Sequence, residues 1–200
     1  MRKSFENALK IFQKNNGILR TSKAQKLGVD TKTLAEMVEA GLLIKEARGI
    51  YRITNLPPLS NPDLVQVSLR VPHGVICLIS ALSFHQVTTQ TPYKIYIAIP
   101  KYAKPPTLDY PPLEVVNLGG NSYSAGIQEY YLDGVLVRIY NKEKTVADCF
   151  KFRKKIGQDI AIEALKQYLH EKGRNIEKLL YFARIDRVEK VMTPYIEAMI

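Results

Sequence analysis

The chain has 200 residues, of which 46% are hydrophobic and 24% are charged, a composition typical of a soluble globular protein. No apolar run approaches the roughly 18–20 residues that a membrane-spanning helix needs, and the first residues lack the apolar core of a secretory signal. Two cysteines and three histidines without metal-ligand spacing predict neither a disulfide framework nor a metal site. We therefore expect a cytoplasmic protein with no membrane contact, no metal and no other cofactor.

The net charge points to a polyanionic partner. Lys and Arg number 29 against 19 Asp and Glu, which gives a formal charge of +10. A surplus of this size concerns partners rather than fold, and nucleic acid is the commonest soluble polyanion. Residues 1–55 carry 11 basic and 5 acidic side chains, so they hold more than half of the surplus. A basic surface that serves only solubility is the alternative.

A proline-rich segment divides the chain. Residues 56–62 contain three prolines, which break helices and central strands. We therefore predict an amino-terminal domain over residues 1–55, a linker over 56–62 and a larger domain over 63–200.

The amino-terminal domain has the element order of a winged helix-turn-helix. Apolar residues at helical spacing predict a helix over 5–12, and a shorter helix follows over 21–27. Asp30 is a favourable cap for a third helix that ends near Ala40. Alternating apolar residues around a turn at 47–49 predict a β-hairpin, the wing.

In such a domain the third helix enters the major groove and the wing can reach the minor groove. Lys32 can contact phosphate or guanine, and Arg48 lies at the tip of the predicted wing. Glu36 could accept a hydrogen bond from cytosine, although we favour a solvated surface charge. A winged helix that binds only protein is the alternative. The predicted DNA-contacting residues are Arg20, Thr21, Ser22, Lys23, Thr31, Lys32, Thr33, Glu36, Arg48 and Arg52.

The sequence of the larger domain predicts a small sheet followed by helices. Alternating isoleucines predict a strand over 93–99, and Asp133-Gly134 predicts a hairpin turn. The order of elements is that of an α+β fold, which we expect to have a small antiparallel sheet and carboxy-terminal helices. The predicted helices span 63–71, 74–84, 142–155, 159–170, 176–183 and 188–200, and the predicted strands span 93–99, 113–118, 127–132 and 135–140.

No catalytic motif is found in either domain. Gly119-Gly120 does not fit a phosphate-binding motif, and we interpret it as a loop. A metal-dependent nuclease would need a carboxylate followed by an acid-x-Lys pattern. The one match, Asp30-Thr31-Lys32, is better explained as a helix cap. We therefore predict a protein that is not an enzyme and has no catalytic residues, with a nucleic-acid enzyme as a rival.

A second basic cluster follows the predicted hairpin. On a helix from residue 142, Val146, Ala147 and Phe150 would face inward and leave an exposed cationic face. That face could contact phosphate or an acidic partner, or it could simply be solvated. The cluster comprises Arg138, Lys144, Lys151, Arg153, Lys154 and Lys155.

Several segments of the chain resemble the AbiEi-type antitoxins of bacterial type IV toxin–antitoxin systems, which act in abortive infection. In the amino-terminal domain they are residues 17–21, 28–43 and 48–51. In the larger domain they are residues 73–82, the Thr91-Pro92 step and residues 137–150. The resemblance spans nearly the whole chain, and residues 137–150 are its more specific part.

The resemblance implies a transcriptional autorepressor that binds inverted repeats of double-stranded DNA ahead of its own operon. It implies that the larger domain counters a toxin resembling a nucleotidyltransferase, usually without a stable complex, so direct contact is left open. Residues 138–155 become a candidate for antitoxicity or added DNA contact. A stand-alone regulator and a protein-binding adaptor are the alternatives, and the sequence does not distinguish monomer from dimer. The implied operator contacts are Arg20, Thr21, Lys23, Thr31, Lys32, Thr33 and Arg48.

Overall fold

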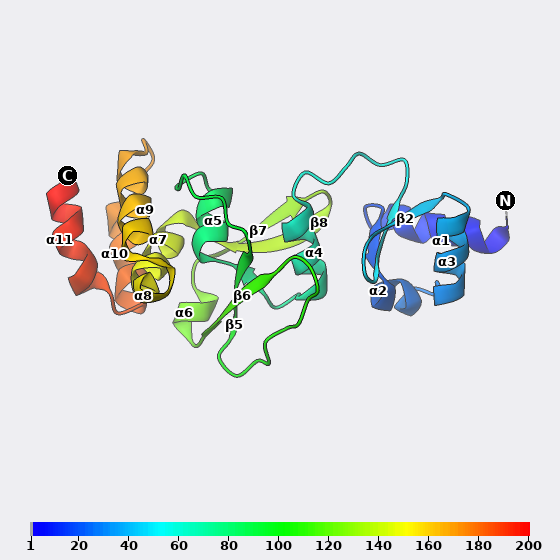
Figure 1. Cartoon of the computed structure of the whole chain (residues 1–200), viewed down its shortest axis with the longest axis horizontal. Helices are drawn as coiled ribbons and strands as arrows, with labels where there is room; N and C mark the ends of the chain where they lie inside the picture. The colour runs from blue at the N-terminus through cyan, green and yellow to red at the C-terminus, as the bar shows by residue number, and fades with distance from the viewer. Residues whose placement is uncertain (1) are drawn as a thin grey trace. The chain divides into compact units, whose positions relative to one another are not determined.

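The computed structural model describes residues 2–200, and Figure 1 shows its helices and strands. These residues form two compact units. The first unit runs to Pro72 and includes Tyr130–Val137, and the second comprises His73–Glu129 and Arg138–Ile200. The sequence had predicted a division at residues 56–62. In the structure the following helix, α4 (Pro62–Arg70), groups with the first unit.

The first unit contains a winged helix-turn-helix. Three strands form an antiparallel sheet in the order β1-β3-β2. The expected hairpin is present, whereas β1, which pairs along its whole length with β3, was expected to be an apolar link. The elements that precede α4 are α1 (Lys3–Lys14), β1 (Ile18–Arg20), α2 (Thr21–Lys26), α3 (Thr31–Glu39), β2 (Leu43–Ala47) and β3 (Ile50–Ile53).

The core of this domain is built from the apolar faces of its helices. Phe12 of α1, Ala24 of α2, and Leu34 and Met37 of α3 are completely buried. Leu34 and Met37 are three positions apart and so lie on one face of α3, and their burial leaves the opposite face of this helix to solvent.

The second unit is built on a five-stranded sheet in the order β6-β5-β4-β8-β7. The outer part of the β7–β8 hairpin belongs to the first unit, as given above. The elements are β4 (Val75–Ile76), α5 (Leu78–Phe84), β5 (Ile95–Pro100), β6 (Leu113–Leu118), α6 (Asn121–Ser124), β7 (Ile127–Leu132), β8 (Val135–Tyr140), α7 (Lys142–Lys151), α8 (Arg153–Ile156), α9 (Gln158–His170), α10 (Ile176–Ile185) and α11 (Glu189–Met199).

The α+β class is confirmed, but the sheet of the second unit is mixed rather than purely antiparallel. β5 pairs with β6 in parallel, and β4 pairs with β8 in parallel. The connection from β5 to β6 is residues 101–112, long enough for the return that a parallel pair requires and longer than a hairpin loop. The helix predicted over 74–84 begins only at Leu78, because Val75 and Ile76 form a central, fully buried strand.

Helices carry most of the core of the second unit. α7 packs against α5, α9 and α10, and its residues from Glu143 to Phe150 are all buried. The single helix predicted over 142–155 is interrupted at Phe152, after which α8 begins. α7 is therefore surrounded by protein rather than exposed along one face.

The start of α7 depends on Asn141, whose side-chain Oδ1 accepts a hydrogen bond from the backbone N–H of Lys144 at 2.9 Å. Replacing Asn141 with alanine should lower the free energy of unfolding by about 1 kcal/mol, because the first turn loses its cap. Urea unfolding followed by circular dichroism measures this loss. Asn141→Ser, which keeps an oxygen at the cap, should recover part of it, and equal losses in both variants would exclude the cap as the cause.

Candidate nucleic-acid interface

The helix-turn-helix is held by a capped entry into α3. Gly28 adopts a positive φ of 93° between α2 and α3, a conformation that glycine reaches without strain. The Asp30 carboxylate then accepts hydrogen bonds from the backbone N–H of Thr33 at 2.8 Å and from its hydroxyl at 3.0 Å. These hydrogen bonds lower the pKa of Asp30, so the cap is charged at neutral pH.

The first turn of α3 is open to solvent. Thr31 is exposed, and the side chain of Lys32 is 86% exposed. Thr33 is half-buried and its hydroxyl is already engaged with Asp30. Glu36 pairs with Arg2 at 2.8 Å, in line with the interpretation of Glu36 as a surface charge. Thr31 and Lys32 are thus the side chains that this turn presents to a ligand.

The wing is tied to the start of α2. Thr21 donates to the Gly49 carbonyl from its backbone N–H at 2.9 Å and from its hydroxyl at 3.2 Å. Arg70 of α4 donates to the carbonyl of Arg48 at 3.0 Å. These contacts hold the backbone of the wing tip, while the Arg48 side chain is exposed.

The start of α2 contributes both structural and exposed groups. Arg20 is half-buried, and its guanidinium donates to the carbonyls of Leu69 and Arg70 at 3.5 and 3.3 Å. Carbonyls at a helix end are natural partners for a cation. Ser22 and Lys23 are exposed. Lys23 is therefore the cation that α2 offers near its amino end.

Arg52 must be removed from the predicted contact set. Its side chain is buried, and its guanidinium pairs with Glu46 and donates to the carbonyls of Leu56 and Pro57 at 2.8 and 3.0 Å. A β-bulge between Lys45 and Ala47 shifts the register of the wing. Arg52 therefore anchors the chain that follows β3 and cannot reach DNA.

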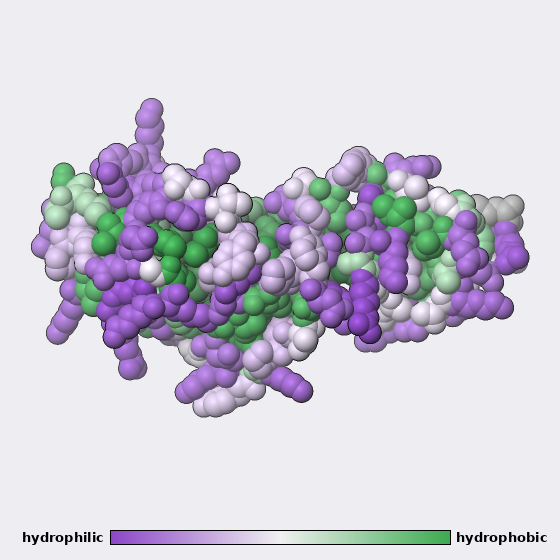
Figure 2. Space-filling view, viewed as in Figure 1, coloured by the Kyte–Doolittle hydropathy of each residue, from purple (hydrophilic) through white to green (hydrophobic). Residues whose placement is uncertain are grey.

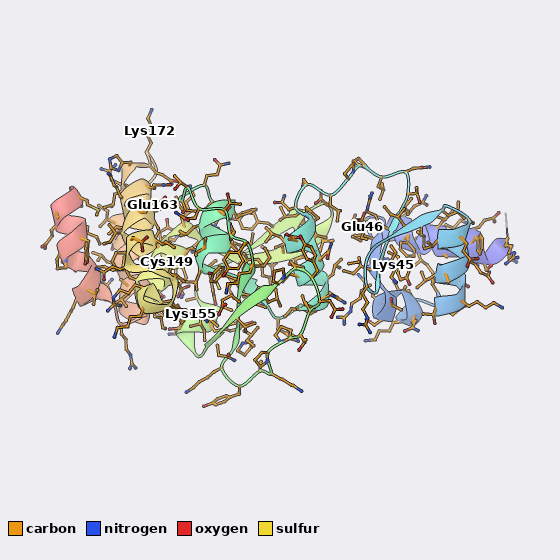
Figure 3. The ribbon with its side chains drawn as sticks, in the orientation of Figure 1. Lys45, Glu46, Cys149, Lys155, Glu163 and Lys172 are labelled. Carbon is orange, nitrogen blue, oxygen red and sulfur yellow. The ribbon has the colours of Figure 1, made fainter. Side chains whose placement is uncertain are left out.

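The same wing presents a cation that the sequence analysis missed. Lys45 is exposed on β2, whereas the neighbouring Glu46 is half-buried, and Figure 3 labels both residues. Leu43 and Lys45 are two residues apart and so lie on the same face of a regular strand, yet Leu43 is buried and Lys45 is exposed. No alternation in the sequence therefore signals Lys45, and the bulge that follows it interrupts the regular pattern.

The second basic cluster is not the exposed face that the sequence predicted. Lys144 is completely buried, with its ammonium paired to Asp148 and, at 3.0 Å, to Asp186. It also lies 4.8 Å from the ring centroid of Tyr140. The prediction was wrong for this residue because other helices surround α7, so its polar face is internal.

Three more members of the cluster have internal partners. Lys151 pairs with Asp186 at 3.0 Å, and Lys155 pairs with Glu114 of β6 at 2.6 Å, where Figure 3 shows it beside the sheet. The guanidinium of Arg153 donates to the Phe150 carbonyl at 2.6 Å. Lys154 is exposed and Arg138 is half-buried. Lys154 and Lys155 are therefore the exposed cations of the cluster, while Lys144 is internal.

Residues 2–200 contain no group of three or more histidine, cysteine, aspartate or glutamate side chains that could hold a metal ion. Nor is any of their helices both long and apolar enough to cross a membrane. Hydrophilic side chains cover much of the visible face of each unit, with apolar residues showing between them (Figure 2).

The fold and the exposed first turn of α3 define a winged helix-turn-helix domain. Residues 7–54 match the sequence model of a family described as a transcriptional regulator, AbiEi antitoxin. The match runs from α1 to the residue after β3. The AbiEi resemblance is therefore confirmed for this domain.

The fold is similar over nearly the whole chain to that of a solved protein. The solved protein is the RV2827C protein from Mycobacterium tuberculosis, whose crystal structure matches with a TM-score of 0.54 and 12% sequence identity. The similarity covers 98% of this chain and 81% of that one, and it concerns the fold alone. No curated protein sequence matches the chain significantly.

Proposed function

We propose that the protein is a DNA-binding transcriptional repressor that binds inverted repeats in its own promoter and acts as the antitoxin of a type IV toxin–antitoxin system. The observation that carries the proposal is an AbiEi-type winged helix whose capped α3 exposes Thr31 and Lys32. The protein would act in the cytoplasm, without catalysis, against a nucleotidyltransferase-like toxin.

The proposed contacts divide into two kinds. Lys32, on the first turn of α3, reads bases in the major groove, where a lysine can donate to the acceptors of guanine. Thr31 beside it can touch a thymine methyl group. Lys23 of α2 contacts phosphate, and Arg48 at the wing tip enters the minor groove. An inverted repeat has two half-sites, so two copies of the chain bind one operator.

Salt dependence tests the phosphate contacts. The winged helix exposes five cations from α2 to the wing, which are Lys23, Lys26, Lys32, Lys45 and Arg48. If one copy engages all five, the logarithm of its association constant should fall with the logarithm of salt concentration at a slope of about −4 to −5. Fluorescence anisotropy at several salt concentrations measures this slope on a single half-site. A slope near zero would contradict binding through phosphate.

Specificity is tested by comparing two DNAs of equal length. One is the DNA upstream of this protein's own gene, and the other is the same DNA scrambled. Tighter binding to the native sequence that persists at higher salt supports a specific repressor. Equal, salt-sensitive binding to both would leave only a basic protein. Capture of a protein partner that resists salt, with no DNA shift, would favour an adaptor instead.

The antitoxin role needs a separate experiment. A nucleotidyltransferase-like gene beside this one would be expressed alone and together with the full chain. Restored growth in the presence of the chain supports the role, whereas unchanged toxicity contradicts it. Operator binding does not decide this outcome, so the two halves of the proposal can fail independently.

A further inference from the structure

A cavity lies in the second unit where two parallel strands end. β5 and β6 run in the same direction, and the last pair of their register is Pro100 with Leu118. The chain beyond each strand lines a cavity of about 800 Å³. Ligands of open α/β sheets bind outside the carboxyl ends of strands, and this volume is in the range of ligand pockets.

One wall of the cavity carries a fixed ammonium group. Lys151, at the end of α7, lines the cavity and donates to the Ser122 hydroxyl at 2.9 Å and to Asp186 Oδ1 at 3.0 Å. Ser122 itself donates to the same Asp186 oxygen at 2.9 Å. An ammonium has three donors, and these contacts use two. With its side chain 29% exposed, Lys151 keeps a donor for a ligand.

The charged residues around this ammonium favour an anion. Asp186 is shared by Lys151 and Lys144, whose ammonium lies 3.0 Å from the other carboxylate oxygen and also pairs with Asp148. The residues that line this cavity and the one adjoining it include three cations, Lys101, Lys151 and Arg187, and one acid, Asp186. The lining therefore carries more positive than negative charge.

An arginine in an unusual conformation borders the same site. Arg187 is exposed and lines an adjoining cavity of about 490 Å³, which shares Gly119, Ser122 and Lys151 with the first. It follows α10 with φ at 59°, a position where helices usually place glycine. This position therefore carries an arginine at a backbone cost, and its side chain adds a cation to the lining of the adjoining cavity.

The lining of the cavity also includes an aromatic ring. Tyr102 lines the cavity, is 91% exposed, and has the Lys101 ammonium 5.3 Å from its ring centroid. The Asn117 amide donates to the carbonyls of Pro100, Lys101 and Ala103 at 3.2–3.3 Å, which fixes the start of this loop. The loop between β5 and β6 extends from the sheet at the lower edge of Figure 1, with long side chains in solvent (Figure 3).

We propose that this cavity binds a free nucleotide, with its phosphates at Lys151 and Arg187 and its base stacked on Tyr102. A base presents a flat π-face that an exposed ring can cover, and phosphates suit fixed cations. The site lies wholly in the second unit and shares no residue with the proposed DNA contacts. Nucleotide binding at this site can therefore be confirmed or refuted independently of operator binding.

Isothermal titration calorimetry of the full chain tests the proposal with ATP, GTP, adenosine and tripolyphosphate as probes. We expect at least one nucleotide to bind tenfold or more tightly than either adenosine or tripolyphosphate. Tyr102→Ala should weaken nucleotide binding about tenfold and leave tripolyphosphate unchanged. Tyr110→Ala is the matched control, since Tyr110 is exposed in the same loop but does not line the cavity.

Arg187→Gly separates ligand binding from folding. Glycine adopts the backbone conformation of this position readily, so the melting temperature should stay the same or rise while nucleotide binding weakens about tenfold. Lys154→Gln removes one exposed charge outside both cavities and should leave binding unchanged. The proposal is overturned by no binding at millimolar nucleotide, by equal losses in the control variants, or by tripolyphosphate binding as tightly as ATP and GTP.

Discussion

Replacing Lys144 with methionine should lower the free energy of unfolding by about 3–5 kcal/mol, because it leaves buried carboxyl groups without their main counter-charge. The ammonium of Lys144 is completely buried and contacts both Asp148 and Asp186. Burial alone would lower the pKa of Lys144, yet the two carboxylates raise it, so the group is charged in the folded protein. Methionine keeps much of the volume and removes the charge together with the hydrogen bonds that the ammonium donates.

Urea unfolding of the full chain measures this loss. Lys154→Met is the matched control, because Lys154 is exposed near the same helix, and a surface change of this kind usually alters stability by less than about 0.5 kcal/mol. Equal effects of the two substitutions would show that the buried ion cluster contributes nothing particular. A large loss in Lys144→Met alone identifies the cluster as the cause.

The same cluster predicts a pH dependence of stability. Burial raises the pKa of Asp148 to about 8, whereas an unfolded aspartate titrates near pH 4. Between these values the unfolded chain releases a proton that the folded chain keeps, so this group's contribution to stability falls as pH rises from about 4 to 8. Asp148→Asn should remove that fall. Urea midpoints from pH 5 to 8 should therefore decline less in the variant, and parallel curves would contradict the expectation.

Asp186 titrates in the opposite sense. Burial favours its neutral form, but Lys144 and Lys151 outweigh burial and lower its pKa. Its contribution is present above the unfolded value near pH 4 and is lost as pH falls below it. Measurements above pH 5 therefore exclude the contribution of Asp186. His85, whose pKa is lowered by burial, also titrates in this range, but it does so equally in the parent protein and in the Asp148→Asn variant.

Replacing Lys32 with alanine should weaken operator binding by about 1–3 kcal/mol, or roughly 5- to 150-fold, if Lys32 reads a base as proposed. The loss on scrambled DNA should be smaller, so specificity should fall together with affinity. Arg48→Ala should act similarly through the wing, and the double variant should lose most of its preference for the operator. Competition anisotropy with the native and scrambled DNAs measures each ratio.

Lys10 provides the matched control for this experiment. It lies on α1, is exposed, and carries the same charge as Lys32, so Lys10→Ala changes the net charge equally. We expect Lys10→Ala to leave the ratio of affinities for the two DNAs unchanged. If Lys10→Ala and Lys32→Ala weaken both DNAs alike, α3 does not read sequence and the cations act only through the overall charge.

The features that the sequence predicted well depend on neighbouring residues. Gly28 and Asp30 mark the turn and the start of α3 within three positions, and the structure confirms both. The strands β1 and β4 were missed because three and two residues are too few to show an alternation. Their existence depends on partners far along the chain.

The candidate sites were predicted less well because side-chain partners are distant in sequence. Lys144 pairs with Asp186, which lies 42 positions later in the chain, and no local sequence pattern predicts that pairing. Arg52 was placed on the DNA side, but it shares the buried face of β3 with Ile50 and its guanidinium pairs with Glu46 of the neighbouring strand. The cavity of the second unit combines the ends of β5, β6 and α7, and its glycines suggested only a loop.

The assignment of residues Tyr130–Val137 to the first unit affects how such a protein could be assembled by recombination. The chain crosses from one unit to the other three times, after Pro72, Glu129 and Val137. A regulator whose two units are joined at one point in the chain can exchange its DNA-binding unit by a single recombination event. Here a recombination event after Pro72 would transfer the first unit without Tyr130–Val137, which belong to the β7–β8 hairpin. Transfer of the whole first unit to another partner unit must therefore carry two separate stretches of gene, which restricts modular exchange.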